Sequence, residues 1–285
     1  MSNKTKGIIL IIISAFSFSW MFVCVRLAGD VPFIQKTFFR NFFAAIIAAG
    51  VLVKNKIGFK WHKENTFGLL MRSVFGILGV LCNFYAIGKL MTADASILNK
   101  LSPFFAIIFS FLILKEKVKL YQAIAVIVAF IGALFVIQPG GNAFDPAMLI
   151  GAVGGMCAGL AYTYVRKVTG NGEKGPTVVF FFSAFSSLVI LPYMIFNFYP
   201  MSAEQLLYLI GSGVAAAMGQ FTITAAYAYA PAREISVFDY TQVVFAAILG
   251  FILFGDVPNI LSFVGYTLII GVAVIMFILN NKEQV

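Results

Sequence analysis

The chain has 285 residues, of which 61% are hydrophobic and only 11% are charged. A soluble domain of this length carries about a quarter charged residues, so the composition excludes a soluble globular protein and indicates one embedded in a membrane. The net charge of +9 would suit a nucleic-acid partner, but the basic residues gather in loops between apolar segments, so we expect no nucleic acid.

Ten apolar runs have roughly the length needed to cross a hydrocarbon core, which takes about 20 helical residues. In chain order the expected spans are Gly7–Gly29, Phe33–Val53, Phe67–Ile87, Ala93–Leu114, Leu120–Ile137, Ala147–Val168, Pro176–Phe196, Gln205–Tyr229, Arg233–Phe254 and Asn259–Leu279. Between them they leave no room for a soluble domain. The sequence therefore predicts an all-α membrane protein of ten transmembrane helices.

The basic residues outside these spans lie mostly on one side of the membrane. That side holds both termini and the lysine-rich segment 54–65, whereas the other side holds only Arg26, Lys36 and Lys89. Cytoplasmic loops are enriched in Lys and Arg. We therefore expect a multi-pass protein of the cytoplasmic membrane, surrounded by lipid, with its N and C termini in the cytoplasm.

The two halves of the chain fall into register when one is shifted by 140 residues against the other. Matching positions include Val25 and Val165, Arg26 and Arg166, Gly79 and Gly219, Ser96 and Ser236, and Phe105 and Phe245. We expect a first five-helix repeat over residues 1–140 and a second over residues 141–285. An odd number of spans per copy inverts the second copy, and inverted repeats are typical of secondary transporters, whose substrate site lies where the copies meet.

Two motifs add a family resemblance. One is Ala-Ser-Ile-Leu-Asn-Lys-Leu-Ser-Pro-Phe-Phe-Ala-Ile-Ile (95–108), followed by an acidic residue at the next loop, and the other is Phe-Phe-Arg-Asn-Phe-Phe (38–43). With this order and duplication, the chain resembles the ten-span EamA-type branch of the drug/metabolite transporter superfamily over nearly its whole length. The resemblance implies a small-metabolite carrier and matches Arg40, Pro103 and Glu116 to the family pattern. The second copy departs from that pattern with Phe180, Val243 and Asp256.

Four ionisable residues lie inside the expected spans, away from their ends: Arg40, Arg72, Lys100 and Asp239. A charge near the bilayer centre costs about 2.5–3.5 kcal/mol on insertion scales, so each one needs a partner or a hydrated cavity. Counting along straight helices places Arg40 and Lys100 in the outer half and Arg72 and Asp239 in the inner half. We expect Arg72 either to pair with Asp239 or to reach the cytoplasmic surface. The outer cations lack an obvious buried anion, which favours a cavity that receives an anionic substrate.

Helical spacing adds polar neighbours to these charges, because Ser96, Asn99 and Lys100 share one helix face. The residues that we expect to contact the substrate are Lys100, Arg40, Asn99, Ser96, Asp239, Tyr240, Trp20, Asn83, Tyr85, Tyr162, Gln220 and Thr224. Other roles remain open at this stage. Arg40 would then have a structural or gating role, and Lys100 would extend to the outer membrane interface. Asp239 would form a salt bridge, and the aromatic residues would pack in the protein core or lie at the membrane interface.

The same residues argue against catalysis. The chain's single histidine, His62, lies in the lysine-rich loop, and there is no H-E-x-x-H or G-x-S-x-G pattern. We expect no enzyme, no cofactor and no metal site. We expect a secondary carrier that moves a small organic anion, or a zwitterion held by its carboxylate, by alternating access. The alternative is a carrier or exporter of a neutral or cationic metabolite (an amino acid, nucleoside, vitamin or amine) held by Asp239 and aromatic residues.

Overall fold

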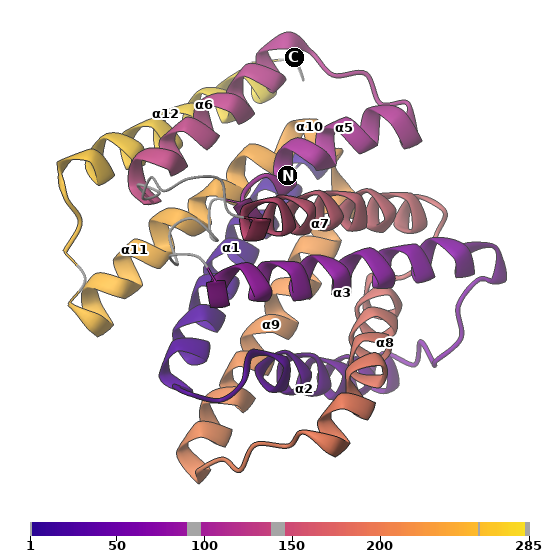
Figure 1. The fold of residues 1–285 in the computed structure, drawn as a ribbon. Coiled ribbons are helices and arrows are strands. Elements are labelled where there is room, and N and C mark those ends of the chain that lie inside the picture. Colours follow the sequence, from indigo (N-terminus) through magenta and orange to yellow (C-terminus); the bar gives the residue numbers. More distant parts are fainter. Residues whose placement is uncertain (1, 90–97, 138–145, 256, 283–285) are drawn as a thin grey trace.

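The computed structural model describes residues 2–89, 98–137, 146–255 and 257–282, and the regular structure in these ranges is helical, without strands (Figure 1). The prediction of an all-α protein is therefore confirmed for the described residues. The α-helices are α1 (Asn3–Leu27), α2 (Phe33–Lys54), α3 (Thr66–Lys89), α5 (Ser102–Leu114), α6 (Leu120–Ile137), α7 (Pro146–Gly170), α8 (Gly175–Phe196), α9 (Ala203–Tyr229), α10 (Ala232–Ile235), α11 (Thr241–Phe254) and α12 (Ile260–Lys282). Two 3₁₀ segments, η1 (Lys63–Asn65) and η2 (Ser236–Tyr240), accompany them.

Eight helical stretches among the described residues are long and apolar enough to cross a membrane. They correspond to eight of the ten expected spans. The other two expected spans contain shorter apolar helices, Ser102–Leu114 and Leu120–Phe135. Residues 93–97 of the expected fourth span lie outside the described residues. The protein is thus a multi-pass membrane protein, and the full count of ten spans stays a prediction.

The most extensive helix packing joins the first half of the chain to the second. Helix α1 packs along α9, α3 along α7, α2 along α8, and α6 along α12. A shift of 140 residues exchanges the α1–α9 pair with the α3–α7 pair and leaves the other two pairs in place. Helices α6 and α12 run side by side at one edge of the molecule (Figure 1).

Small residues let α3 and α7 approach closely. A Cβ added at Gly79 would lie 3.1 Å from the carbonyl oxygen of Gly154 and 3.2 Å from the backbone nitrogen of Ala158. Transmembrane helices gain no hydrophobic driving force from one another, so such close van der Waals packing stabilises their association. The contact therefore places the backbone of α3 close against that of α7.

One membrane-crossing stretch in the second half is not a continuous α-helix. Between Ala232 and Phe254 the short helix α10 passes into the 3₁₀ segment η2, and α11 starts only at Thr241. A mid-helix stretch of 3₁₀ structure often marks a functional hinge or a sequence under strain. The first half has a corresponding irregularity, because Lys100 and Leu101 form a turn directly before α5. Both irregular segments lie at the centre of the fold.

Candidate functional site

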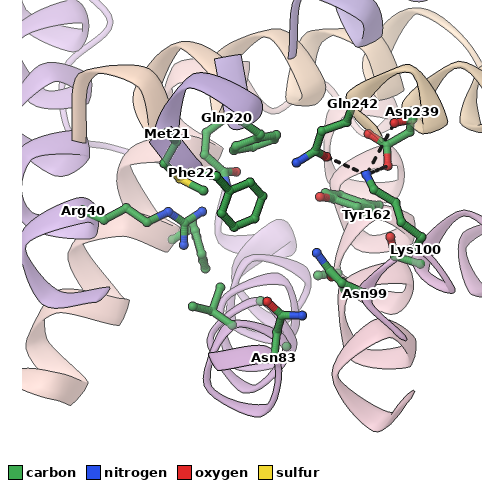
Figure 2. A pocket seen from close by; sticks show the side chains of 18 of the residues that line it. Met21, Phe22, Arg40, Asn83, Asn99, Lys100, Tyr162, Gln220, Asp239 and Gln242 are labelled. Atoms are coloured by element: carbon green, nitrogen blue, oxygen red, sulfur yellow. Dashed lines mark hydrogen bonds and ion pairs between the residues drawn. The ribbon is translucent and has the colours of Figure 1, made fainter. Parts of the chain in front are cut away.

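A pocket lies at this centre, bounded by α1, α2, α3, α7, α8 and α9 and by the two irregular segments (Figure 2). Its lining residues are Phe18, Met21, Phe22, Arg40, Arg72, Gly76, Gly79, Val80, Asn83, Asn99, Lys100, Ser102, Ala158, Ala161, Tyr162, Phe182, Gln220, Asp239 and Gln242. All four ionisable residues predicted from the spans reach it. The ionisable residues that lie within the expected spans are therefore gathered around one pocket.

Lys100 forms an ion pair with Asp239 at one side of the pocket. Its Nζ lies 3.3 Å from Oδ2 of Asp239 and donates a 2.6 Å hydrogen bond to Oε1 of Gln242. The backbone carbonyl oxygen of Asp239 lies 3.4 Å from the same Nζ. Figure 2 shows the three side chains converging from the start of α5 and from the η2–α11 segment. The ammonium group thus has three oxygen acceptors, and the expectation that Lys100 lacks a buried anion was wrong.

Arg72 does not pair with Asp239, contrary to one of the two expectations. Its Nη2 donates a 2.9 Å hydrogen bond to Oε1 of Gln220, and its guanidinium carbon lies 4.0 Å from the ring centroid of Phe182. The side chain is only 3% exposed, so it also does not extend to the surface. Neither of these partners carries a negative charge, and the cation–π contact stabilises the guanidinium without neutralising it.

Arg40 extends from α2 into the pocket, where Figure 2 shows its guanidinium on the side opposite Lys100, with the ring of Phe22 between them. The side chain is 5% exposed. Its Nε is buried and has no hydrogen-bond partner among the described residues, and the same holds for Nε of Arg72. A buried donor without a partner loses about 1–3 kcal/mol of solvation, so both guanidinium groups have donor capacity that the described residues leave unused.

Helix phase explains which expected residues reach the pocket. Arg40, Asn83, Asn99, Lys100, Tyr162, Gln220 and Asp239 line it. Trp20 and Tyr85 do not, and they are 42% and 40% exposed. Each lies two residues from a lining residue of its own helix, Phe22 and Asn83, and two residues carry a side chain to the opposite helix face. The structure thus places Trp20 and Tyr85 outside this pocket.

Two further residues of the expected set are packed outside the pocket lining. Tyr240 is fully buried and outside the lining, and its hydroxyl donates a 2.8 Å hydrogen bond to the carbonyl oxygen of Lys100. Thr224 is buried one turn beyond Gln220, where its methyl group faces Gly175 of α8. Ser96, also expected in the site, lies outside the described residues. Tyr240 therefore supports the position of Lys100 instead of facing the pocket.

Several lining residues were absent from the expected set. Gln242 was missed, although it follows Asp239 by three residues, a spacing that shares a helix face. Phe18, Met21 and Phe22 were missed because α1 is apolar on every side, so its sequence gives no sign of which face meets the pocket. Arg72 was recognised as an intramembrane charge but was assigned to structure instead of the site.

The comparisons with known proteins agree with a transport role. The model of the EamA-like transporter family matches residues 5–138 and 145–278. The pseudopaline exporter CntI of Pseudomonas aeruginosa is 30% identical over 268 residues, which cover 93% of each chain. The riboflavin transporter of Vibrio cholerae is 30% identical over 205 residues, which cover 70% of this chain and 65% of that one. A solved crystal structure shares the fold, with a TM-score of 0.84 at 16% identity over 99% of both chains.

Proposed function

Because the chain belongs to the EamA-like transporter family, whose relatives are transporters and not enzymes, we propose that it carries a small organic anion, or a zwitterion held by its carboxylate. In this proposal Arg40 and Arg72 bind the negative group inside the pocket. The protein itself is a multi-pass membrane transporter with a small-molecule substrate. The chemical class of that substrate and the route of transport are the subject of the proposal.

The observation that carries the proposal is the pair of buried guanidinium groups without a carboxylate partner among the described residues. Asp239 is the acidic residue of the lining, and its Oδ2 already pairs with Nζ of Lys100 at 3.3 Å. A carboxylate at 4 Å from a guanidinium would gain about 4 kcal/mol at an effective dielectric constant of 20. An anionic substrate would satisfy both arginines, whereas a cation would have to displace Lys100 and approach two like charges.

The two interrupted helices support the same choice. Ser102, the first residue of α5, and Gln242, the second residue of α11, both line the pocket, so each helix presents its N-terminal end there. The N-terminal end of a helix carries a partial positive charge, which favours anions. Broken helices with this orientation occur at the substrate sites of other secondary transporters.

We further propose that the carrier works by alternating access of two inverted five-helix repeats, residues 1–140 and 141–285. The exchange of helix pairs under the 140-residue shift supports this arrangement, as does the match of the family model to two separate segments. The pocket lies between the halves, so rocking one half against the other would open it to either side in turn. The lysine-rich segment 54–65 supports cytoplasmic termini in the cytoplasmic membrane.

Counterflow in proteoliposomes tests the proposal. Vesicles loaded with an unlabelled carboxylate should take up the labelled compound transiently and saturably, because a carrier exchanges its substrates. Substitution of both arginines by glutamine should abolish the uptake, while Arg233→Gln, outside the pocket, should leave it unchanged. Uptake of amines or nucleosides in place of carboxylates would contradict the anion proposal, and an unsaturable conductance would contradict the carrier mechanism.

A further inference from the structure

The charged side chains that line the pocket bear on the net charge of the substrate. We infer that the substrate is a dianion, such as a dicarboxylate or a phosphate monoester, with one negative charge for each of Arg40 and Arg72. This inference rests on the proposed function, because it concerns the same pocket. It narrows the broad class of organic anions and zwitterions to compounds of net charge −2.

The first step is that Lys100 contributes no free charge. Its ammonium group has three hydrogens and three oxygen acceptors: Oδ2 of Asp239 at 3.3 Å, Oε1 of Gln242 at 2.6 Å and the carbonyl oxygen of Asp239 at 3.4 Å. The side chains of Lys100 and Asp239 are 8% and 9% exposed, so water screens the pair little. The positive charge of the lysine and the negative charge of the aspartate therefore cancel within the pocket.

The second step is that neither arginine is neutralised by a described residue. Arg72 meets the neutral amide of Gln220 and the face of the Phe182 ring, and Arg40 leaves its buried Nε without a partner. Both groups line one pocket, so their like charges repel each other at low dielectric. A monoanion leaves one positive charge uncompensated. A trianion brings an excess negative charge near Asp239, so two charges give the best balance.

The third step concerns where the dianion lies. Figure 2 shows the Lys100, Asp239 and Gln242 cluster on one side of Phe22 and Arg40 on the other. The phenylalanine ring separates the neutral ion pair from the arginine side of the pocket. Arg40 and Arg72 line the same pocket, so a dianion bound between them would leave the ion pair closed. The planar guanidinium fork suits both carboxylate and phosphate oxygens, so either chemistry fits the site.

A charge series on the purified full-length protein tests the inference. Thermal stabilisation would be titrated at pH 7.5 with butyrate, succinate and tricarballylate, which have similar backbones and one, two or three carboxylates. Glycerol 3-phosphate and its methyl phosphodiester form a second arm that distinguishes phosphate from carboxylate. We expect the dianion of at least one arm to bind at least tenfold more tightly than its monoanion, and the trianion of the carboxylate series to bind less tightly than succinate.

Variants then connect the preferred charge to each arginine. Arg40→Gln and Arg72→Gln should each remove the advantage of the dianion over the monoanion, whereas Arg40→Lys and Arg72→Lys should keep it. The lysine variants also serve as the test if the glutamine variants fail to fold. Arg233→Gln, an arginine outside the lining, is the matched control and should bind as the wild type does. Asp94 is an acidic residue six positions before Lys100 in the sequence, outside the described residues, and Asp94→Asn should also leave the preference unchanged.

The outcomes separate the inference from the proposed function. Equal binding of monoanions and dianions, unchanged by the arginine variants, would overturn the dianion inference and leave an anion carrier. A second result would also overturn the dianion inference: the wild type prefers a monoanion, and Asp94→Asn prefers a dianion. That result would mean that Asp94 neutralises one of the two arginines in the wild type. Stabilisation by amines and by no anion in either arm would overturn the proposed function itself.

Discussion

The hydroxyl group of Tyr240 donates a 2.8 Å hydrogen bond to the carbonyl oxygen of Lys100. The two residues are 140 positions apart, so they correspond to each other in the two halves of the chain. Both stand where regular α-helix is interrupted: Lys100 lies two residues before the first residue of α5, and Tyr240 lies directly before α11. The ion pair between Lys100 and Asp239 joins the same two segments. The interrupted helices therefore brace each other beside the pocket.

Removing one partner of the buried ion pair should destabilise the protein more than removing both. Lys100→Met leaves the Asp239 carboxylate buried without its ammonium partner, which costs about 3–5 kcal/mol. Asp239→Asn should cost a similar amount, and the double variant should recover much of the loss. Reversible unfolding in detergent measures the coupling of the two sites. Strictly additive losses would contradict a direct pair.

Phe22 and Trp20 should differ sharply in their effect on ligand binding. Phe22→Ala removes a ring that lines the pocket, so we expect anion affinity to fall about tenfold or more. Trp20→Ala removes a larger ring from the opposite helix face, which is 42% exposed and suited to lipid contact, and affinity should stay within twofold. Titration of both variants with the same anion checks the assignment. If Trp20→Ala lowered the anion affinity more than Phe22→Ala does, the ligand would bind on the other face of α1, contrary to the assignment.

Two glycines of α7 offer a matched test of helix packing. A Cβ at Gly159 would lie 2.6 Å from Cβ of Phe105 and 2.7 Å from the backbone nitrogen of Ala106, whereas a Cβ at Gly170 meets nothing within 4 Å. Gly159→Ala should therefore force α5 and α7 apart and destabilise the protein by about 1–3 kcal/mol. Gly170→Ala should be neutral or stabilising by up to about 1 kcal/mol. Melting temperatures of the two variants, compared with wild type, decide the point.

Arg166 should be important for stability because it joins three segments. Its Nε lies 3.3 Å from Oε1 of Glu116, and its Nη1 donates hydrogen bonds to the carbonyl oxygens of Tyr227, at 3.2 Å, and Ala228, at 2.9 Å. Arg166→Gln should lower the stability by about 1–3 kcal/mol, since these acceptors lose a charged donor. Arg233→Gln is the control, because Arg233 forms a 3.9 Å contact with its neighbour Glu234. Equal melting temperatures for the two variants would count against the role of Arg166.

The fold class and the identity of the intramembrane charges follow from the sequence, because apolar length and buried charge leave strong signals. The pairing of those charges does not. Counting residues along straight helices put Lys100 and Asp239 at different depths, but their charged atoms lie 3.3 Å apart, and Asp239 lies in η2, where the regular α-helix is interrupted. No composition rule reveals that interruption, since the segment Ser236–Tyr240 has no proline or glycine.

The choice between Phe22 and Trp20 was also beyond the sequence. In a soluble protein a helix shows its buried face as an apolar stripe, but lipid is as apolar as a protein core. Helix α1 therefore carries apolar residues on all sides, and its pocket face is set by its neighbours α9 and α11. Arg40, in contrast, lines the pocket as expected, because a charge in a membrane is constrained far more strongly than an aromatic ring.

A structure of the carrier with a bound dicarboxylate would test the account most directly. We predict carboxylate oxygens within hydrogen-bond distance of both Arg40 and Arg72, with the ion pair between Lys100 and Asp239 still closed. An anion seated on Lys100 with Asp239 displaced, or one that contacts neither guanidinium, would contradict the assignment of the arginine pair as the substrate site.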